Sequence, residues 1–160
     1  MKNLIKKNDS FYVAGHNGMV GSAIVRCLLK KGYCNQQKGG KLLIPERKNL
    51  DLLNFDKVLS WFKEHRPNVV ILAAAKVGGI ISNYKYPFNF LSENLRIQQN
   101  VIESAWITGA KRLLFLGSSC IYPKNSNQPI REEELLTNSL EKTNEAYAIA
   151  KISGIKLCEA

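Results

Sequence analysis

A tyrosine and a lysine in the stretch NEAYAIAKISG, residues 144–154, have the spacing of a proton-transfer pair. On a helix, Tyr147 and Lys151 lie one turn apart on the same face. A phenol with its ordinary pKa of about 10 is a poor acid or base at neutral pH. We therefore expect the lysine ammonium to stabilise the phenolate and lower the pKa of Tyr147. Because the spacing is common by chance, its weight depends on what accompanies it.

Serine and cysteine side chains precede this helix in the stretch LGSSCIYP, residues 116–123. The apolar run before them predicts a buried strand, which places Ser118, Ser119 and Cys120 just beyond its carboxyl end. Ligands of parallel sheets bind at that edge. There a serine hydroxyl can hold a substrate oxygen while Tyr147 moves a proton as hydride is transferred. Taken alone, Cys120 also fits a small buried apolar residue.

Strand and helix patterns alternate along the chain. Apolar runs predict strands at 10–15, 41–45, 68–75 and 112–119, and helical spacing predicts helices at 18–31, 55–65, 88–108 and from about 144. This alternation indicates an α/β fold with a Rossmann-type parallel sheet and helices on both faces. We expect residues 1–160 to form one dinucleotide-binding domain.

A glycine-rich turn follows the first predicted strand in the stretch GHNGMVG. Gly15 permits a tight turn, Gly18 lets a pyrophosphate approach the backbone, and Gly21 lets the helix pack closely on the strand. The N–H groups that begin the helix favour phosphate binding. The alternative is a tight turn without a ligand.

The end of the second predicted strand bears on the choice of cofactor. A basic residue there accepts the 2′-phosphate of NADP, whereas an acidic one binds the ribose of NAD. In the stretch IPERKNLDL, Arg47 and Lys48 outnumber Glu46, which favours NADP. A solvated charged turn remains the alternative.

Composition and charge limit the function classes. The chain is 45% hydrophobic and 22% charged, with no apolar run of membrane-spanning length and no signal-peptide pattern, so we expect a cytoplasmic protein without a membrane partner. The net charge of +10 is dispersed and not interleaved with aromatic residues, which argues against nucleic-acid binding. The four cysteines lack metal-site spacing, and with two histidines we expect no metal site and no disulfide framework.

Four segments together resemble the extended short-chain dehydrogenase/reductase family of nucleotide-sugar epimerases, dehydratases and reductases. They are VAGHNGMVGSAI, LAAAKVGGI, LLFLGSSCIYPK and NEAYAIAKISGIKLCE, and they run through nearly the whole chain. Within the family, GSSCIYPK and AAAKVGGI are similar to the branch that epimerises a GDP-4-keto-6-deoxy sugar at C3 and C5 and reduces it at C4.

The resemblance assigns expected roles to particular residues. It implies Ser118, Tyr147 and Lys151 as the catalytic triad and Cys120 as an acid–base group of the epimerisation. Asn94 matches an asparagine of many relatives, although it also fits a polar residue on a helix surface. The residues implied in NADP binding are Gly15, His16, Asn17, Gly18, Met19, Val20, Gly21, Arg47, Leu50, Leu116, Gly117, Ser118, Ser119 and Lys151. It also implies a GDP-sugar substrate and a homodimer.

Family members are roughly twice this length, and their second half grips the GDP-sugar and completes the sheet. We therefore expect an incomplete fold in which the fourth strand is an apolar edge. We also expect isolated residues 1–160 to bind NADP(H) weakly without turning over GDP-sugar. The alternatives are another NAD(P)-dependent nucleotide-sugar epimerase or dehydratase, and a non-catalytic dinucleotide-binding fragment.

Overall fold

The structure is a computed structural model that describes residues 5–160. Its strands are β1 (Ser10–Ala14), β2 (Lys41–Leu43), β3 (Val69–Leu72) and β4 (Arg112–Phe115). Its α-helices are α1 (Met19–Lys30), α2 (Phe55–His65), α3 (Ile80–Lys85), α4 (Pro87–Ile107) and α5 (Glu145–Glu159). Short 3-10 helices are η1 (Gln36–Lys38), η2 (Ser119–Ile121) and η3 (Glu132–Glu134). No helix among these residues has the length and apolar character needed to cross a membrane.

The chain divides into two compact units. The sheet unit comprises the chain up to Ala75 together with Arg96–Leu116. The second unit comprises Lys76–Leu95 together with Gly117–Ala160. Helix α4 therefore contributes its first part to the second unit and its remainder to the sheet unit.

The sheet unit contains a four-stranded parallel sheet in the order β2-β1-β3-β4. Strands β1 and β3 occupy the centre, and their residues are almost entirely buried, as the continuous apolar runs predict. Strand β4 ends the sheet on one side, and its Leu114 is half exposed. The expected Rossmann-type arrangement, including an apolar edge at the fourth strand, is confirmed.

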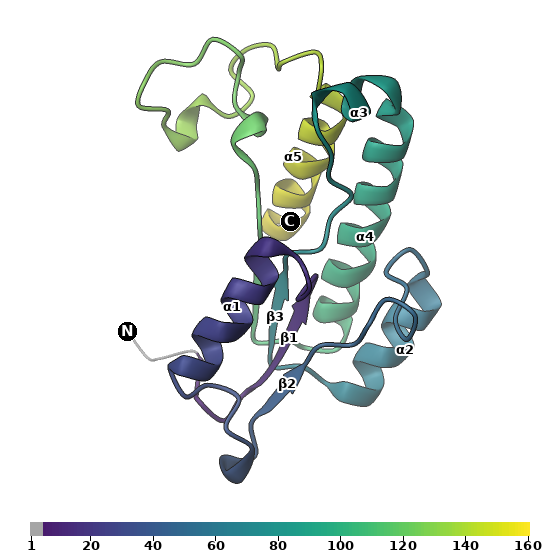
Figure 1. The fold of residues 1–160 in the computed structure, drawn as a ribbon, viewed down its shortest axis with the longest axis vertical. Coiled ribbons are helices and arrows are strands. Elements are labelled where there is room, and N and C mark those ends of the chain that lie inside the picture. The colour runs from purple at the N-terminus through teal and green to yellow at the C-terminus, as the bar shows by residue number, and fades with distance from the viewer. Residues whose placement is uncertain (1–4) are drawn as a thin grey trace. The chain divides into compact units, whose positions relative to one another are not determined.

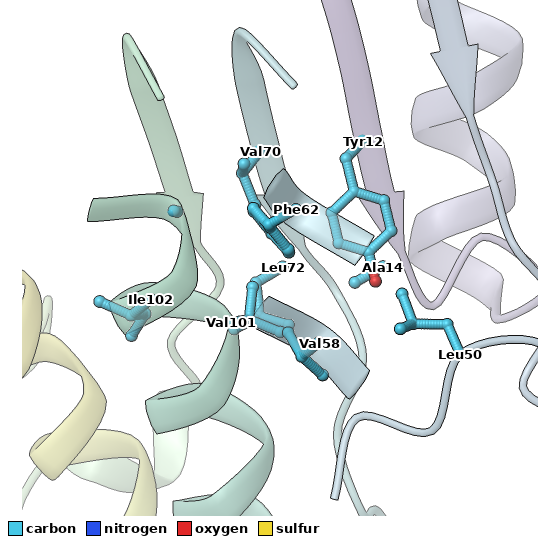
Figure 2. Packing of buried hydrophobic residues seen from close by; sticks show 10 residues of the cluster. Tyr12, Ala14, Leu50, Val58, Phe62, Val70, Leu72, Val101 and Ile102 are labelled. Atoms are coloured by element: carbon cyan, nitrogen blue, oxygen red, sulfur yellow. The ribbon is translucent and has the colours of Figure 1, made fainter. Parts of the chain in front are cut away.

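Alternating strand residues build two cores, one on each face of the sheet. Tyr12 and Leu72 point to the face covered by α2 and α4, where they pack with Phe62 and Val101 (Figure 2). Their neighbours along the strands pack on the opposite face against Ile24, Val25 and Leu28 of α1. Figure 1 shows α1 and α2 on opposite sides of the strands. The predicted helices on both faces are thus present.

The predicted helices agree closely with those observed, and the strands are shorter than predicted. One α-helix and the three short 3-10 helices were not predicted. The stretch KVGGIISNYKYP reads as a loop, but the structure forms α3 within it.

An ion pair between a buried carboxylate and a half-exposed lysine joins the residue before β1 to the residue before β4. Asp9 Oδ1 lies 2.7 Å from Lys111 Nζ, and Asp9 Oδ2 accepts a hydrogen bond of 2.8 Å from the Lys6 backbone N–H. Burial raises the pKa of Asp9, but the hydrogen bonds from Lys111 and Lys6 outweigh it and hold the pKa below its ordinary value. The pair therefore stabilises the fold above that ordinary pKa, and the contribution is lost as the pH falls through the lowered pKa.

We expect Lys111→Met to destabilise the protein by about 1–3 kcal/mol at pH 7, because it leaves the Asp9 carboxylate buried beside one remaining donor. The loss should shrink at pH 4, where the carboxyl of the variant takes up a proton. Urea unfolding at the two pH values measures both effects. Lys156→Met is the control, since it removes an exposed pair with Glu159 and should cost little. A loss equal to the control, or equal at both pH values, would contradict this account.

Candidate active site

The glycine turn of the sheet unit joins β1 to α1. Gly15 adopts a left-handed φ of +83°, and a Cβ on it would lie 2.7 Å from the backbone nitrogen of Ala74. The Gly18 N–H donates to the Gly15 carbonyl at 3.0 Å. A Cβ on Gly21 would lie only 2.1 Å from that same carbonyl oxygen. Gly15 and Gly21 are therefore required by the fold itself, as the sequence predicts.

Gly18 has no comparable structural constraint. It is exposed, has an extended backbone, and a Cβ on it would meet its nearest neighbour at 3.4 Å, an ordinary contact. Gly18 is the N-cap residue of α1 and has no side chain that could accept a hydrogen bond from the first N–H groups of the helix. The first turn of α1 also contains no acidic residue. Asn17, Met19 and Val20 are also exposed, and His16 is partly buried. The surface at the start of α1 therefore fits a phosphate group.

The turn after β2 carries two basic residues, Arg47 and Lys48, and one acidic residue, Glu46. Lys48 pairs with Glu46 at 2.7 Å, and both side chains are exposed. Arg47 is exposed between them. Leu50 was also implied in cofactor binding, but its side chain is 4% exposed and packs in the core, so a contact with a nucleotide would come from its backbone.

Ser118 and Cys120 are brought together by η2 in the second unit. Ser118 caps this short helix, and the Cys120 thiol donates to Ser118 Oγ at 3.1 Å. Both side chains are partly buried, whereas Gly117 and Ser119 are exposed. Leu116, the last residue of the sheet unit, is partly buried. The helix η2 packs against α5, which carries the tyrosine and lysine.

Tyr147 and Lys151 lie on α5 as their spacing predicts. Lys151 Nζ is 5.9 Å from the centroid of the Tyr147 ring, and Lys151 is 4% exposed. The Ser118 side chain lies close enough to the Tyr147 phenol to lower its pKa. All four predicted catalytic residues are therefore gathered within the second unit.

The predicted lowering of the Tyr147 pKa is wrong. Burial raises the pKa of Tyr147, a charge on Cys120 raises it further, and the hydrogen bond with Ser118 lowers it without reversing the direction. Burial likewise lowers the pKa of Lys151, against an opposing effect of Cys120. Desolvation, which residue spacing does not report, has the largest effect on both pKa values.

Asn94 fixes the chain that leaves β3. Its Oδ1 accepts from the Lys76 N–H at 2.8 Å, and its Nδ2 donates to the carbonyls of Lys76 at 3.0 Å and Phe90 at 2.7 Å. Asn94 is 2% exposed, which excludes the alternative of a polar residue on a helix surface. The Lys76 side chain is paired with Glu93 at 3.1 Å.

Asn83 supports the start of α3, and its role was not predicted from the sequence. Its Nδ2 donates to the carbonyls of Gly78 at 2.8 Å and Gly79 at 3.1 Å, which anchors α3 to the glycine pair. An asparagine four and five residues after two glycines is the signal that would have indicated a helix here rather than an open loop.

Comparison with known proteins identifies the family. A model of the NAD dependent epimerase/dehydratase family matches residues 11–160. The chain belongs to this family. The match includes both the glycine turn and the Ser118–Tyr147–Lys151 group.

Within the family, the chain is similar to GDP-L-fucose synthases. It is 56% identical to GDP-L-fucose synthase 1 of Arabidopsis thaliana, over 96% of this chain and 46% of the relative. It is 50% identical to GDP-L-fucose synthase of Escherichia coli strain K12, over 93% and 44% respectively. A solved structure of MlghC, a GDP-mannoheptose C4 reductase from Campylobacter jejuni with NADP bound, is similar with a TM-score of 0.89 and 37% identity, over 97% of this chain and 47% of that one. The chain thus spans less than half the length of the relatives it matches.

Proposed function

We propose that this chain provides the NADP-binding and proton-transfer residues of a GDP-L-fucose synthase. The reaction is conversion of GDP-4-keto-6-deoxy-D-mannose to GDP-L-fucose by epimerisation at C3 and C5 followed by reduction at C4. The observation that carries the proposal is the contact between the Cys120 thiol and Ser118, whose side chain also lowers the pKa of Tyr147. A thiol is thereby placed beside the residues of a ketone reduction. Identity of 50–56% with GDP-L-fucose synthases supports it.

Different side chains of the second unit perform the separate steps of the proposed reaction. The 4-keto group acidifies the hydrogens on C3 and C5, so that the Cys120 thiolate can act as a base toward one of them. Ser118 donates a hydrogen bond to the ketone oxygen and stabilises the negative charge that develops there. Tyr147 gives its proton to the same oxygen during reduction, and the buried Lys151 ammonium stabilises the phenolate that remains.

NADPH supplies the hydride when it is bound. The residues that fit it in the sheet unit are Gly15–Gly21 for the pyrophosphate and Arg47 for the 2′-phosphate. The fit rests on two observations: exposed Gly18 leaves open the backbone at the start of α1, and Arg47 stands outside the Lys48–Glu46 pair. From the second unit, we assign Gly117, Ser119 and Lys151 to the nicotinamide end.

Three further features remain proposals. We propose a homodimer, a cytoplasmic location, and a role for residues 1–160 as the dinucleotide-binding domain. Sedimentation of the purified protein tests the first of these.

The experiment is a fluorescence titration of the purified protein with NADPH, with NADH as the reference. We expect the wild type to bind NADPH more tightly than NADH. Arg47→Ala should weaken NADPH binding by about tenfold or more, because a charge-assisted hydrogen bond to the phosphate is lost, and should change NADH binding little. Arg26→Ala is the matched control, since this cation lies away from the turn on α1. Equal binding of both cofactors by the wild type would contradict the NADP assignment.

The reaction itself is tested by incubating the protein with GDP-4-keto-6-deoxy-D-mannose and NADPH. Formation of GDP-L-fucose supports the assigned reaction, and it would contradict the expectation that residues 1–160 alone do not turn over the GDP-sugar. Formation of the C4-reduced sugar without inversion at C3 and C5 would overturn it in favour of a simple reductase.

A further inference from the structure

The last residue of the stretch GSSCIYPK has no part in the proposed reaction, but it forms an ion pair across a long loop. Lys124 Nζ lies 2.7 Å from Glu141 Oε2, and the Lys124 backbone N–H donates to the Ser139 carbonyl at 3.0 Å. These contacts join the two ends of the loop of residues 125–140, which leads from η2 toward α5. All of these residues belong to the second unit. We call the Lys124–Glu141 ion pair the loop-closing pair.

The loop itself contains little that would keep its ends together. None of the residues 125–140 is buried. Hydrogen bonds around η3 are local, such as the bond from the Leu135 N–H to the Glu132 carbonyl at 3.2 Å. Because closing a long exposed loop costs conformational entropy, its ends stay together only where contacts join them. The loop-closing pair and the backbone bond of Lys124 are such contacts.

Glu141 extends this connection to the start of α5. Its Oε1 accepts from the Thr143 backbone N–H at 3.3 Å, and its backbone carbonyl accepts from the Asn144 N–H at 3.2 Å. The Asn144 carbonyl in turn accepts from the Ala148 N–H at 3.0 Å, in the first turn of α5. Glu141 therefore contacts both the opposite end of the loop and the residues that lead into α5.

Both members of the pair are close in the chain to residues of the candidate active site. Lys124 follows Ser118 by six residues, and Glu141 precedes Tyr147 by the same number. Six residues span at most about 20 Å, so the pair limits how far the two segments can separate. The helix η2 also packs directly against α5. The direct packing and the loop-closing pair are therefore two attachments between the same two segments.

We propose that Lys124 and Glu141 are positioning residues, whose ion pair holds the segment of Ser118 and Cys120 in place beside the first turn of α5, where Tyr147 lies. The inference rests on the proposed function only for the chemical roles of the residues that are positioned. The side chains of the pair are 59% and 35% exposed, so the pair adds little to global stability. Its effect is on the geometry of these two segments.

The charge of Glu141 suits this role. The hydrogen bond from Lys124 is the largest of the effects that hold the pKa of the Glu141 carboxyl below its ordinary value. The hydrogen bond from the Thr143 N–H acts in the same direction and exceeds the opposing effect of burial. The carboxylate is therefore ionised at neutral pH, where it pairs with the lysine ammonium.

The test is NMR spectroscopy of the purified protein at pH 7, in which amide hydrogen exchange and the ring signal of Tyr147 are measured. Tyr147→Phe identifies that ring signal. Lys124→Met removes the loop-closing pair, whereas Lys124→Arg keeps a cation in its place. Lys156→Met is the matched control, because it removes another exposed lysine–glutamate pair of the second unit, on α5 itself.

We expect Lys124→Met to speed amide exchange in η2 and in the first turn of α5 by about fivefold, the factor that corresponds to a well-formed exposed ion pair. The ring signal of Tyr147 should shift in the same variant. Lys124→Arg should restore both quantities, and Lys156→Met should change neither. Glu141→Gln should act as Lys124→Met does, and the double variant should show no further effect, because either change removes the same interaction.

An unchanged ring signal of Tyr147 in Lys124→Met, or additive effects of Lys124→Met and Glu141→Gln, would overturn the inference. Circular dichroism checks that each variant is folded. If Lys124→Met does not fold, Glu141→Gln replaces it, since the amide oxygen can still accept from the Thr143 N–H. NADPH titration of the same preparations tests the proposed function separately. A shifted Tyr147 signal without NADPH binding would support the positioning role and contradict the proposed function.

Discussion

Replacing Gly18 with alanine should weaken NADPH binding at least about tenfold, a loss of roughly 1.4 kcal/mol of binding free energy, while the melting temperature stays nearly unchanged. A Cβ at this position meets its nearest neighbour at 3.4 Å, so the fold has room for it. The residue is exposed at the start of α1, where the methyl group would stand between the backbone N–H groups and an approaching phosphate. The expected loss is therefore specific to the ligand.

Gly21→Ala should behave differently, with loss of both binding and stability. Its Cβ would lie 2.1 Å from the Gly15 carbonyl oxygen and 2.9 Å from the His16 Cα, and these are backbone atoms that cannot turn aside. Relief requires α1 to move away from the turn, which disrupts the packing of α1 on β1. Overpacking of this kind typically costs about 1–3 kcal/mol.

Gly79→Ala is the control for both variants, because its backbone is ordinary and a Cβ there meets nothing within 4 Å. Thermal unfolding and NADPH fluorescence are measured on all three proteins. If Gly18→Ala binds NADPH as well as the control does, the glycine turn is structural only, and the phosphate site proposed there is wrong.

The sheet was predictable because burial on both faces leaves a simple trace in the sequence. The run VVIL of β3 is apolar at every position, and all four residues are buried. Helix α3 leaves no such trace. Its Ile80, Ile81 and Tyr84 are exposed, and its one buried residue is the polar Asn83. Hydrogen bonds from Asn83 to the preceding glycine pair, rather than an apolar face, accompany the helix there.

The candidate site was predictable in its spacing and less so in its energetics. A separation of four residues places Tyr147 and Lys151 on one face of any helix, and the short interval between Ser118 and Cys120 allows a single 3-10 turn to join them. The direction of the Tyr147 pKa was wrong because burial decides it. The burial of Leu50 in the core could not be predicted either, because a leucine after a strand fits both a turn that binds a ligand and the hydrophobic core.

Asn94→Asp should destabilise the protein by about 3 kcal/mol at pH 7.5, although the two side chains have nearly the same shape. Asn94 holds both the N–H and the carbonyl of Lys76, as a neighbouring strand would. A carboxylate still accepts from the Lys76 N–H, but it has no proton to donate. It would instead face the carbonyl oxygens of Lys76 and Phe90, which Nδ2 now contacts at 3.0 and 2.7 Å.

The pH dependence of this variant separates a lost hydrogen bond from a packing defect. Burial and the two carbonyls disfavour the anion, so the pKa of the new carboxyl is raised in the folded state. A raised pKa gives stability that is present at low pH and lost as the pH rises through it. Asn94→Asp should therefore recover part of its stability at pH 5, whereas Asn94→Leu should not.

Urea unfolding at pH 5 and pH 7.5 measures this difference, with Asn89→Asp as the control on the exposed side of the same helix. Equal losses for Asn94→Asp at the two pH values would show that the donor role of Asn94 is unimportant. Recovery of stability at pH 5 would show that a hydrogen-bond donor at the Asn94 side chain holds the chain that leaves β3. Lys76, the first residue of the second unit after β3, is the residue that this attachment holds.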